Sequence, residues 1–170
     1  MKCYMWIFIL ALSLVICSQA SALILKSPDF ADGEKLPLKS GYERDNVSPF
    51  IEWEDVPANT ASFVLIMDDP DANGWVHWII YNIPASITSL KGDFPRDEKI
   101  KDGTMQGVNS FNKVGYGGPC PPRGTHRYVF KLFALDTLLE LEPKAQRGDL
   151  LKAMKGHIIQ ETTLTGKFSK

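Results

Sequence analysis

The stretch from Tyr116 to Ala134 constrains the fold of this chain most, because a rigid loop runs directly into an apolar segment there. Its first half contains three glycines and three prolines, which exclude a helix or a central strand and predict a stiff loop with amide N–H groups open to approach. Residues 128–134 are mostly apolar and predict a buried strand. His126 stands at the junction. The stretch therefore predicts either a site anchored on a rigid scaffold or a plain hairpin loop with an exposed histidine.

The composition is that of a single globular domain. The chain has 170 residues, a formal net charge of −1 and 44% hydrophobic residues, which suffices for one domain with a real core. Neither a basic patch nor an arginine-rich run stands out, so we expect no nucleic-acid partner. The charge balance does not favour binding to a membrane surface either.

Residues 1–22 have the pattern of a secretory signal peptide. Lys2 gives a short positive start, Trp6–Ile16 is almost entirely apolar, and Ala20-Ser21-Ala22 fits the cleavage rule, which places the mature start at Leu23. The apolar run is too short for a transmembrane helix, although a retained anchor is the alternative. We expect an exported protein, periplasmic or secreted, with residues 23–170 as its domain and no integral membrane segment after cleavage.

Removal of this leader also removes two of the three cysteines and leaves Cys120. No intramolecular disulfide can then form, so the exported domain must be held together by its hydrophobic core.

Two long strands are predicted before the central loop, over Ser62–Met67 and Trp75–Ile83. In the second strand, alternation places Val76, Trp78 and Ile80 on one face and His77, Ile79 and Tyr81 on the other. Apolar residues on both faces indicate a strand that is buried on both sides, so His77 is expected to point into the protein.

Shorter elements complete a mostly β fold with one or two helices. The only convincing helix covers Asp149–Lys155, with Leu150, Leu151 and Met154 at core spacing. The shorter strand predictions are Leu23–Leu25, the segment around Phe50 to Trp53, Met105–Phe111 and Ile158–Leu164.

The acidic turn between the two long strands resembles half of a calcium loop. Asp69, Asp71, Asn73 and Gly74 match the first half of an EF-hand, but the glutamate required at position twelve is replaced by Ile80 and no helices flank the turn. Calcium binding of that type is rejected.

Other chemistry is conceivable where strand ends converge. His77, His126 and a carboxylate or Cys120 could bind zinc, although their spacing matches no compact zinc motif. Cys120 and His126 could form a nucleophile pair, but prolines on both sides of Cys120 leave no helix N-terminus to lower the pKa of its thiol.

An anion-binding pocket fits these residues better. Two imidazoles and the backbone amides of a glycine- and proline-rich loop can hold an anion. Asp69 or Asp71 would then orient a histidine and raise its proton affinity. The plain alternative is that each aspartate caps a turn and each histidine is a satisfied core residue.

Taken together, these segments resemble the phosphatidylethanolamine-binding protein family, also called the Raf kinase inhibitor protein family. The residues within the motifs are most similar to those of its bacterial branch. The motifs that carry the resemblance are Asn46-Val47-Ser48-Pro49 with Trp53, Asp69-Pro70-Asp71-Ala72, His77-Trp78, Gly117-Gly118-Pro119-Cys120-Pro121-Pro122 with Gly124, and His126-Arg127-Tyr128. The resemblance covers nearly all of residues 23–170.

The resemblance implies a large central antiparallel sheet, a small second sheet, peripheral helices and a small anion cavity for phosphate or a phospholipid head group. Carried over by motif, the ligand-binding residues are Asp69, Asp71, His77, Gly118, Pro119, His126 and Tyr128. No catalytic residue, metal or cofactor is implied.

Three departures from the family pattern stand out. Asn73 and Ser110 occupy positions where many members have proline and aspartate. The chain also ends soon after its last predicted strand, without the C-terminal helix that covers the pocket in animal members.

We therefore expect an exported, non-enzymatic binding protein for phosphate-type groups or phospholipid head groups. Its main rival is an inhibitor or interaction protein that acts on a protease or another protein through the pocket rim. A weak hydrolase or metal enzyme built on Asp69, His77 and His126 is the third alternative, and the sequence offers it neither a credible nucleophile nor a full ligand set.

Overall fold

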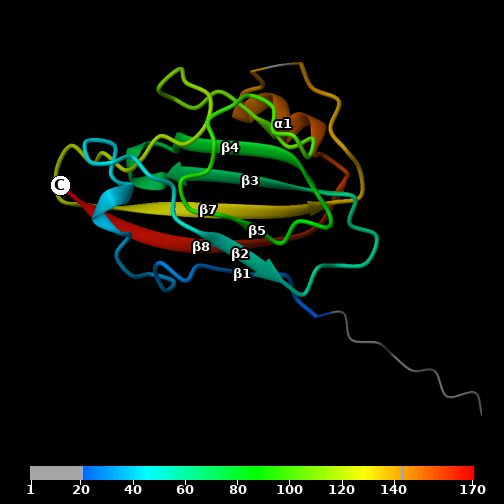
Figure 1. Cartoon of the computed structure of the whole chain (residues 1–170), viewed down its shortest axis with the longest axis horizontal. Helices are drawn as coiled ribbons and strands as arrows, with labels where there is room; N and C mark the ends of the chain where they lie inside the picture. The colour runs from blue at the N-terminus through cyan, green and yellow to red at the C-terminus, as the bar shows by residue number, and fades with distance from the viewer. Residues whose placement is uncertain (1–20, 143) are drawn as a thin grey trace, which may run out of the picture.

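Two antiparallel sheets form the framework of the protein. A computed structural model describes residues 21–142 and 144–170, so most of the expected signal peptide lies outside the described residues. The larger sheet has the strand order β6-β4-β3-β7-β8 and the smaller one the order β1-β2-β5. Figure 1 shows the larger sheet through the middle of the molecule, with α1 on one side and the small sheet on the other. The strands are β1 (Ile24–Lys26), β2 (Ile51–Glu54), β3 (Ser62–Asp69), β4 (Trp75–Pro84), β5 (Ser89–Leu90), β6 (Met105–Gln106), β7 (Thr125–Leu135) and β8 (Ile158–Ser169).

The centre of the large sheet is buried on both faces, as the continuous apolar runs predict. All eight residues of β3 are buried, and two separate clusters of apolar side chains cover them. One cluster lies between the sheets and includes Trp53, Trp78 and Phe130. The other lies under α1 (Arg147–Ala153) and includes Ile66 and Leu150. The expected mostly β architecture of two sheets is confirmed.

Simple alternation predicts the faces of residues 78–81 of β4 correctly, but not that of Val76. Met67 pairs with Trp78, whereas Asp68 pairs with Val76, so His77 is an extra residue in β4. This β-bulge reverses the phase of the strand, and Val76 joins the cluster under α1 while Trp78 joins the cluster between the sheets. A bulge also re-aims the side chain that it carries, and here that side chain is His77.

The bounds of several elements differ from the predictions. β8 continues to Ser169, five residues beyond the predicted end at Leu164, because it pairs with β7 along its whole length. α1 starts at Arg147 rather than Asp149, and Leu151 is 45% exposed instead of packed in the core. The strand predicted over 105–111 is limited to Met105–Gln106.

Strand pairing brings the predicted site residues to one end of the large sheet. β3 ends at Asp69, β4 begins at Trp75 and β7 begins at Thr125, and β3 is antiparallel to both neighbours. The three strand termini therefore meet at the same end of the sheet.

Among the helices of the described residues, none is long and apolar enough to cross a membrane.

Candidate ligand-binding site

The site is built on the short turn that follows β3. Asp69 caps a single 3-10 turn, η2 (Pro70–Ala72), and its Oδ1 accepts hydrogen bonds from the amides of Asp71 at 2.8 Å and Ala72 at 3.1 Å. Pro70 suits the first position of such a turn because it has no N–H to satisfy. Asn73 ends it in the left-handed conformation, with φ of 55°. This geometry fixes the Asp69 carboxylate, and the residue is only 2% exposed.

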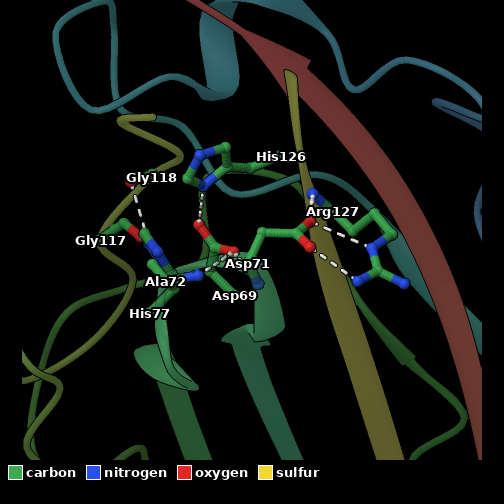
Figure 2. Close-up of polar contacts among 8 residues, drawn as sticks. All are labelled: Asp69, Asp71, Ala72, His77, Gly117, Gly118, His126 and Arg127. Carbon is green, nitrogen blue, oxygen red and sulfur yellow. Dashed lines mark hydrogen bonds and ion pairs between the residues drawn. The ribbon is translucent and has the colours of Figure 1, made fainter. Parts of the chain in front are cut away.

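The second oxygen of Asp69 holds His126. Nδ1 of His126 lies 2.8 Å from Oδ2 of Asp69, and Figure 2 shows the imidazole directly above the carboxylate. Since a carboxylate only accepts, Nδ1 donates, and Nε2 of His126 remains open. Sequence reasoning expected an aspartate to orient a histidine, and in the structure these two residues are paired.

His77 is anchored in the same way, but by backbone carbonyls. Its Nδ1 lies 2.7 Å from the carbonyl oxygen of Gly117 and 3.1 Å from that of Gly118. Carbonyl oxygens cannot donate, so the hydrogen sits on Nδ1 and Nε2 carries the lone pair of the neutral ring. The residue is 2% exposed, as the apolar strand predicted.

Burial lowers the pKa of His77, and it outweighs the opposite effects of the two carbonyls and of Asp69 and Asp68. Asp69 does raise the proton affinity of His77, as expected of a neighbouring aspartate, but this effect is smaller than that of burial and the net pKa is lowered. Removing an imidazole from water penalises its charged form, and His77 has no carboxylate in direct contact to offset that penalty.

The glycine loop does not offer the free amides that its composition suggested. The N–H of Gly117 donates to the carbonyl of His77 at 2.9 Å, and the N–H of Gly118 donates to Oδ1 of Asn46 at 2.7 Å. These two donors are already used inside the protein, and the carbonyls of the same two glycines accept from His77.

Asn46 is a positioning residue that sequence reasoning missed. The peptide unit between Gly117 and Gly118 is held at both ends, since its carbonyl accepts from His77 and its N–H donates to Asn46. A Cβ on Gly118 would lie 2.1 Å from the backbone oxygen of Ser40, which explains the glycine. In the sequence, Asn46 stood out only as part of the motif Asn46-Val47-Ser48-Pro49, and in the structure it adopts a left-handed φ of 55°.

Asp71 does not orient a histidine. Figure 2 shows the two aspartates of the turn directed at different partners. The carboxylate of Asp71 accepts two hydrogen bonds from the guanidinium of Arg127, at 3.0 Å and 2.7 Å, and a third from its backbone amide at 2.9 Å. Arg127 lowers the pKa of Asp71 to about 2. The pair ties η2 to β7 and leaves Asp69 as the aspartate of the site.

Tyr128 packs against the imidazole ring of His77. The two rings meet edge to face, with centroids 5.1 Å apart. The tyrosine is fully buried, and burial raises the pKa of its hydroxyl. Asp69 lies near that hydroxyl and adds to the rise of its pKa.

A cavity of about 220 Å³ opens over these groups. Its lining residues are Asp69, Ala72, Trp75, His77, Cys120 and Pro122. Of the seven predicted ligand-binding residues, only Asp69 and His77 line it. His126 is connected to the cavity through its hydrogen bond to Asp69. Gly118 and Tyr128 both contact His77 and hold it in place. Pro119 lines a neighbouring groove, and Asp71 pairs with Arg127.

Neither metal nor nucleophile chemistry gains support from the geometry. Within residues 21–142 and 144–170, no three histidine, cysteine or acidic side chains come together as a metal site. Packing around the sulfur of Cys120, together with the nearby Glu43 and Asp69, raises the pKa of the thiol, which is unfavourable for a nucleophile.

Comparison with known proteins agrees with this architecture. The sequence model of the phosphatidylethanolamine-binding protein family matches residues 26–169. A UPF0098 protein of Methanothermobacter thermautotrophicus is 44% identical over 148 residues, which cover 86% of this chain and 98% of the relative. The UPF0098 protein YbhB of Escherichia coli is 38% identical over 156 residues, covering 85% and 99% of the two chains.

Two solved structures have the same fold. A phosphatidylethanolamine-binding protein homologue from Chlamydia trachomatis superposes with a TM-score of 0.81 and 36% identity, covering 88% of this chain and 98% of that one. Escherichia coli YbcL, described as a member of the mammalian family, also gives a TM-score of 0.81, with 32% identity and coverage of 88% and 99%. The chain thus belongs to the phosphatidylethanolamine-binding protein family, whose membership suggests a binding protein.

Proposed function

We propose that this protein is an exported, non-enzymatic binding protein whose cavity takes phosphate-type groups, including phospholipid head groups. The observation that carries the proposal is the arrangement of two imidazoles around Asp69. Both rings are anchored through Nδ1, His77 by carbonyls and His126 by the carboxylate, so each keeps Nε2 for a ligand.

The charge of Asp69 does not oppose this assignment, because its oxygens are already occupied. Oδ1 accepts from two amides and Oδ2 from His126. A bound anion therefore meets a carboxylate that is screened by its own donors, together with two rings that can become cationic. A hydrogen bond between charged groups is about twice as strong as a neutral one. Ala72, Trp75 and Pro122 supply apolar walls beside these groups.

Replacement of Asp69 by asparagine is expected to lower ligand affinity about ten-fold while leaving stability within about 1 kcal/mol. Asparagine caps a turn as well as aspartate does, so η2 stays intact. The charged acceptor of the hydrogen bond from His126 is replaced by a neutral one. Calorimetric titration with glycerophosphoethanolamine, a soluble phosphodiester, measures the affinity, and a thermal melt measures the stability.

The chain offers a matched control for this experiment. His157 and Asp136 form another pair with the same Nδ1–carboxylate distance of 2.8 Å, away from the cavity and half exposed. Asp136→Asn should leave the affinity unchanged. Equal effects of the two substitutions, or no binding of glycerophosphoethanolamine by the wild-type protein, would refute the proposal.

The proposed absence of enzymatic activity is supported by the state of Cys120 and His126. The pKa of the thiol is raised, and the hydrogen bonds of His126 among the described residues join it to Asp69 and not to Cys120, so the pair considered from sequence is not assembled as nucleophile and base.

Export is supported by the sequence of residues 1–22 and makes a separate prediction. Protein recovered from the periplasm or the culture medium should start at Leu23 and carry a single titratable thiol after denaturation, from Cys120. Intact-mass measurement tests this prediction. A mass that still includes residues 1–22 would point to a retained anchor instead.

A further inference from the structure

A cluster of unpaired cations surrounds an exposed leucine beside the ligand-binding end of the molecule. The cations are Lys35, Lys39, Arg44, Lys167 and Lys170, and all five residues are exposed. None of them takes part in an ion pair with another described residue. We call this surface, together with Leu38, the basic rim.

Folding brings these residues together from distant parts of the sequence. The backbones of Lys35 and Lys167 form a parallel bridge, and the amide of Leu36 donates to the carbonyl of Lys167 at 2.8 Å. Two lysines are thereby held side by side, an arrangement that repels until an anion neutralises it. The overall charge of −1 gave no sign of this local surface.

The rim contains two grooves that are lined by several of its cations. Lys35, Arg44, Lys167 and Lys170 line a groove of about 160 Å³, and Arg44 and Lys170 also line an adjoining groove of about 120 Å³. Among the described residues that line these two grooves, Glu43 is the only acid. The groove beside α1 has the opposite character, with Glu140, Glu142 and Asp149 in its lining.

The basic rim adjoins the ligand-binding cavity. Cys120 and Pro122 line both that cavity and the smaller groove. Figure 1 places the C-terminus, the turn η1 (Leu38–Ser40) and the start of β7 at one end of the molecule, away from α1. A surface that binds the rim would therefore lie next to the cavity opening.

We propose that the basic rim docks the protein on an anionic phospholipid bilayer. Leu38 is 71% exposed and is followed directly by Lys39, so an apolar side chain projects from the middle of the cations. Cations attract anionic head groups, and an exposed leucine can enter the interface between them. The rim presents no exposed aromatic residue on which nucleic-acid bases could stack, and no deep apolar pocket that would anchor an acidic protein. The proposal does not depend on the proposed function of the cavity.

Vesicle flotation tests this surface. The purified protein is mixed with vesicles of equal parts phosphatidylglycerol and phosphatidylcholine, or of phosphatidylcholine alone. We expect binding only to the mixed vesicles. Raising the salt from about 0.1 M to about 1 M should abolish it, because the Debye length falls from about 10 Å to about 3 Å. The double variant Lys35→Glu/Lys167→Glu should reduce binding at least about ten-fold, and Leu38→Ser should reduce it by a smaller factor.

A matched control is present on α1. Leu151 is also exposed and stands next to Lys152, with Lys155 a turn away. Lys152→Glu/Lys155→Glu should leave vesicle binding unchanged, and any contribution of residues 1–22 is common to all variants. Equal losses in the two double variants would overturn the proposal, as would absence of wild-type binding. Capture of DNA or heparin without vesicle binding would overturn the choice of partner.

The same proteins separate this inference from the function of the cavity. Lys35→Glu/Lys167→Glu should still bind soluble glycerophosphoethanolamine, since neither lysine lines the cavity. Asp69→Asn should still float with the mixed vesicles. Vesicle binding without glycerophosphoethanolamine binding would support the basic rim and refute the proposed function of the cavity.

Discussion

Trp78→Ala is expected to lower the free energy of unfolding by about 3–5 kcal/mol. The indole is fully buried between the sheets and meets Phe94 and Tyr116 edge to face, at centroid distances of 5.8 Å and 5.4 Å. Its Nε1 donates to Oε1 of Gln106 at 2.8 Å. Truncation would open a cavity and also leave a buried acceptor without a donor, which adds to the cost. Urea denaturation followed by circular dichroism measures the loss.

Trp75 provides the control on the same strand. It is 42% exposed, so Trp75→Ala should cost much less, about 1 kcal/mol from partial loss of apolar contact. Asp69→Asn should also be mild because the turn keeps its cap. If Asp69→Asn proved as damaging to stability as Trp78→Ala, Asp69 would be a structural residue and its assignment to the site would be wrong.

The sequence was most informative where burial alone decides structure. The continuous apolar runs of β3, β4 and β7 predicted the centre of the large sheet, because only a strand covered on both faces tolerates such runs. The sequence was less informative where strand pairing decides how far a strand extends. β8 is polar and alternating beyond Leu164, and its pairing with β7 extends it to Ser169. Leu151 has the spacing of a core residue, but its side chain on α1 is exposed to solvent.

The bulge at His77 shows why the face of Val76 at the start of β4 could not be assigned from alternation. The pattern of Val76, Trp78 and Ile80 is perfectly periodic, yet an extra residue in β4 between the pairs Asp68–Val76 and Met67–Trp78 reverses the phase. Nothing in the residue types marks a bulge when its extra residue is buried. Only the pairing of β4 with β3 reveals the bulge. The bulge re-aims the side chain of His77, which lines the cavity.

Within the site, residue types predicted which groups meet but not how they pair. That an aspartate would meet a histidine followed from strand ends that converge, and the structure pairs Asp69 with His126. Asp71 could have taken the same role, and it binds Arg127 because a guanidinium offers a carboxylate two parallel donors. The amides of Gly117 and Gly118 were predicted to be open because the loop is rich in glycine. They are occupied by the carbonyl of His77 and by Asn46, which lies far away in sequence.

Ligand affinity is expected to rise as the pH falls from about 8 to about 6, because His77 must take up a proton to donate to an anion. Its Nδ1 is committed to carbonyl oxygens, so Nε2 is the only nitrogen that can face a ligand, and in the neutral ring it is an acceptor. Burial lowers the pKa of His77 in the free protein, whereas a bound anion raises it. Glycerophosphoethanolamine keeps one negative phosphodiester charge over this range, so the change reports on the protein.

The unliganded protein should respond to pH in the opposite direction. Because the folded pKa of His77 lies below the unfolded value near ~6.5, the unfolded state binds more protons between those two values. The free energy of unfolding therefore falls as the pH drops through that window, and the contribution of His77 is fully present above it. A lower pH should therefore reduce the stability of the protein without ligand and increase its affinity for the ligand.

His77→Gln and His126→Gln should each weaken binding about ten-fold to a hundred-fold at pH ~6, since a hydrogen bond to a charged group contributes about 1.5–3 kcal/mol. His77→Gln should also flatten most of the pH dependence. His157, the third histidine, pairs with Asp136 away from the cavity, so His157→Gln should retain both the affinity and its pH profile. Calorimetry at several pH values in buffers of different ionisation enthalpy counts the protons taken up. A flat wild-type profile, or glutamine variants that bind as tightly as wild type, would remove the two imidazoles from the site and leave a cavity that recognises its ligand by shape and apolar contact alone.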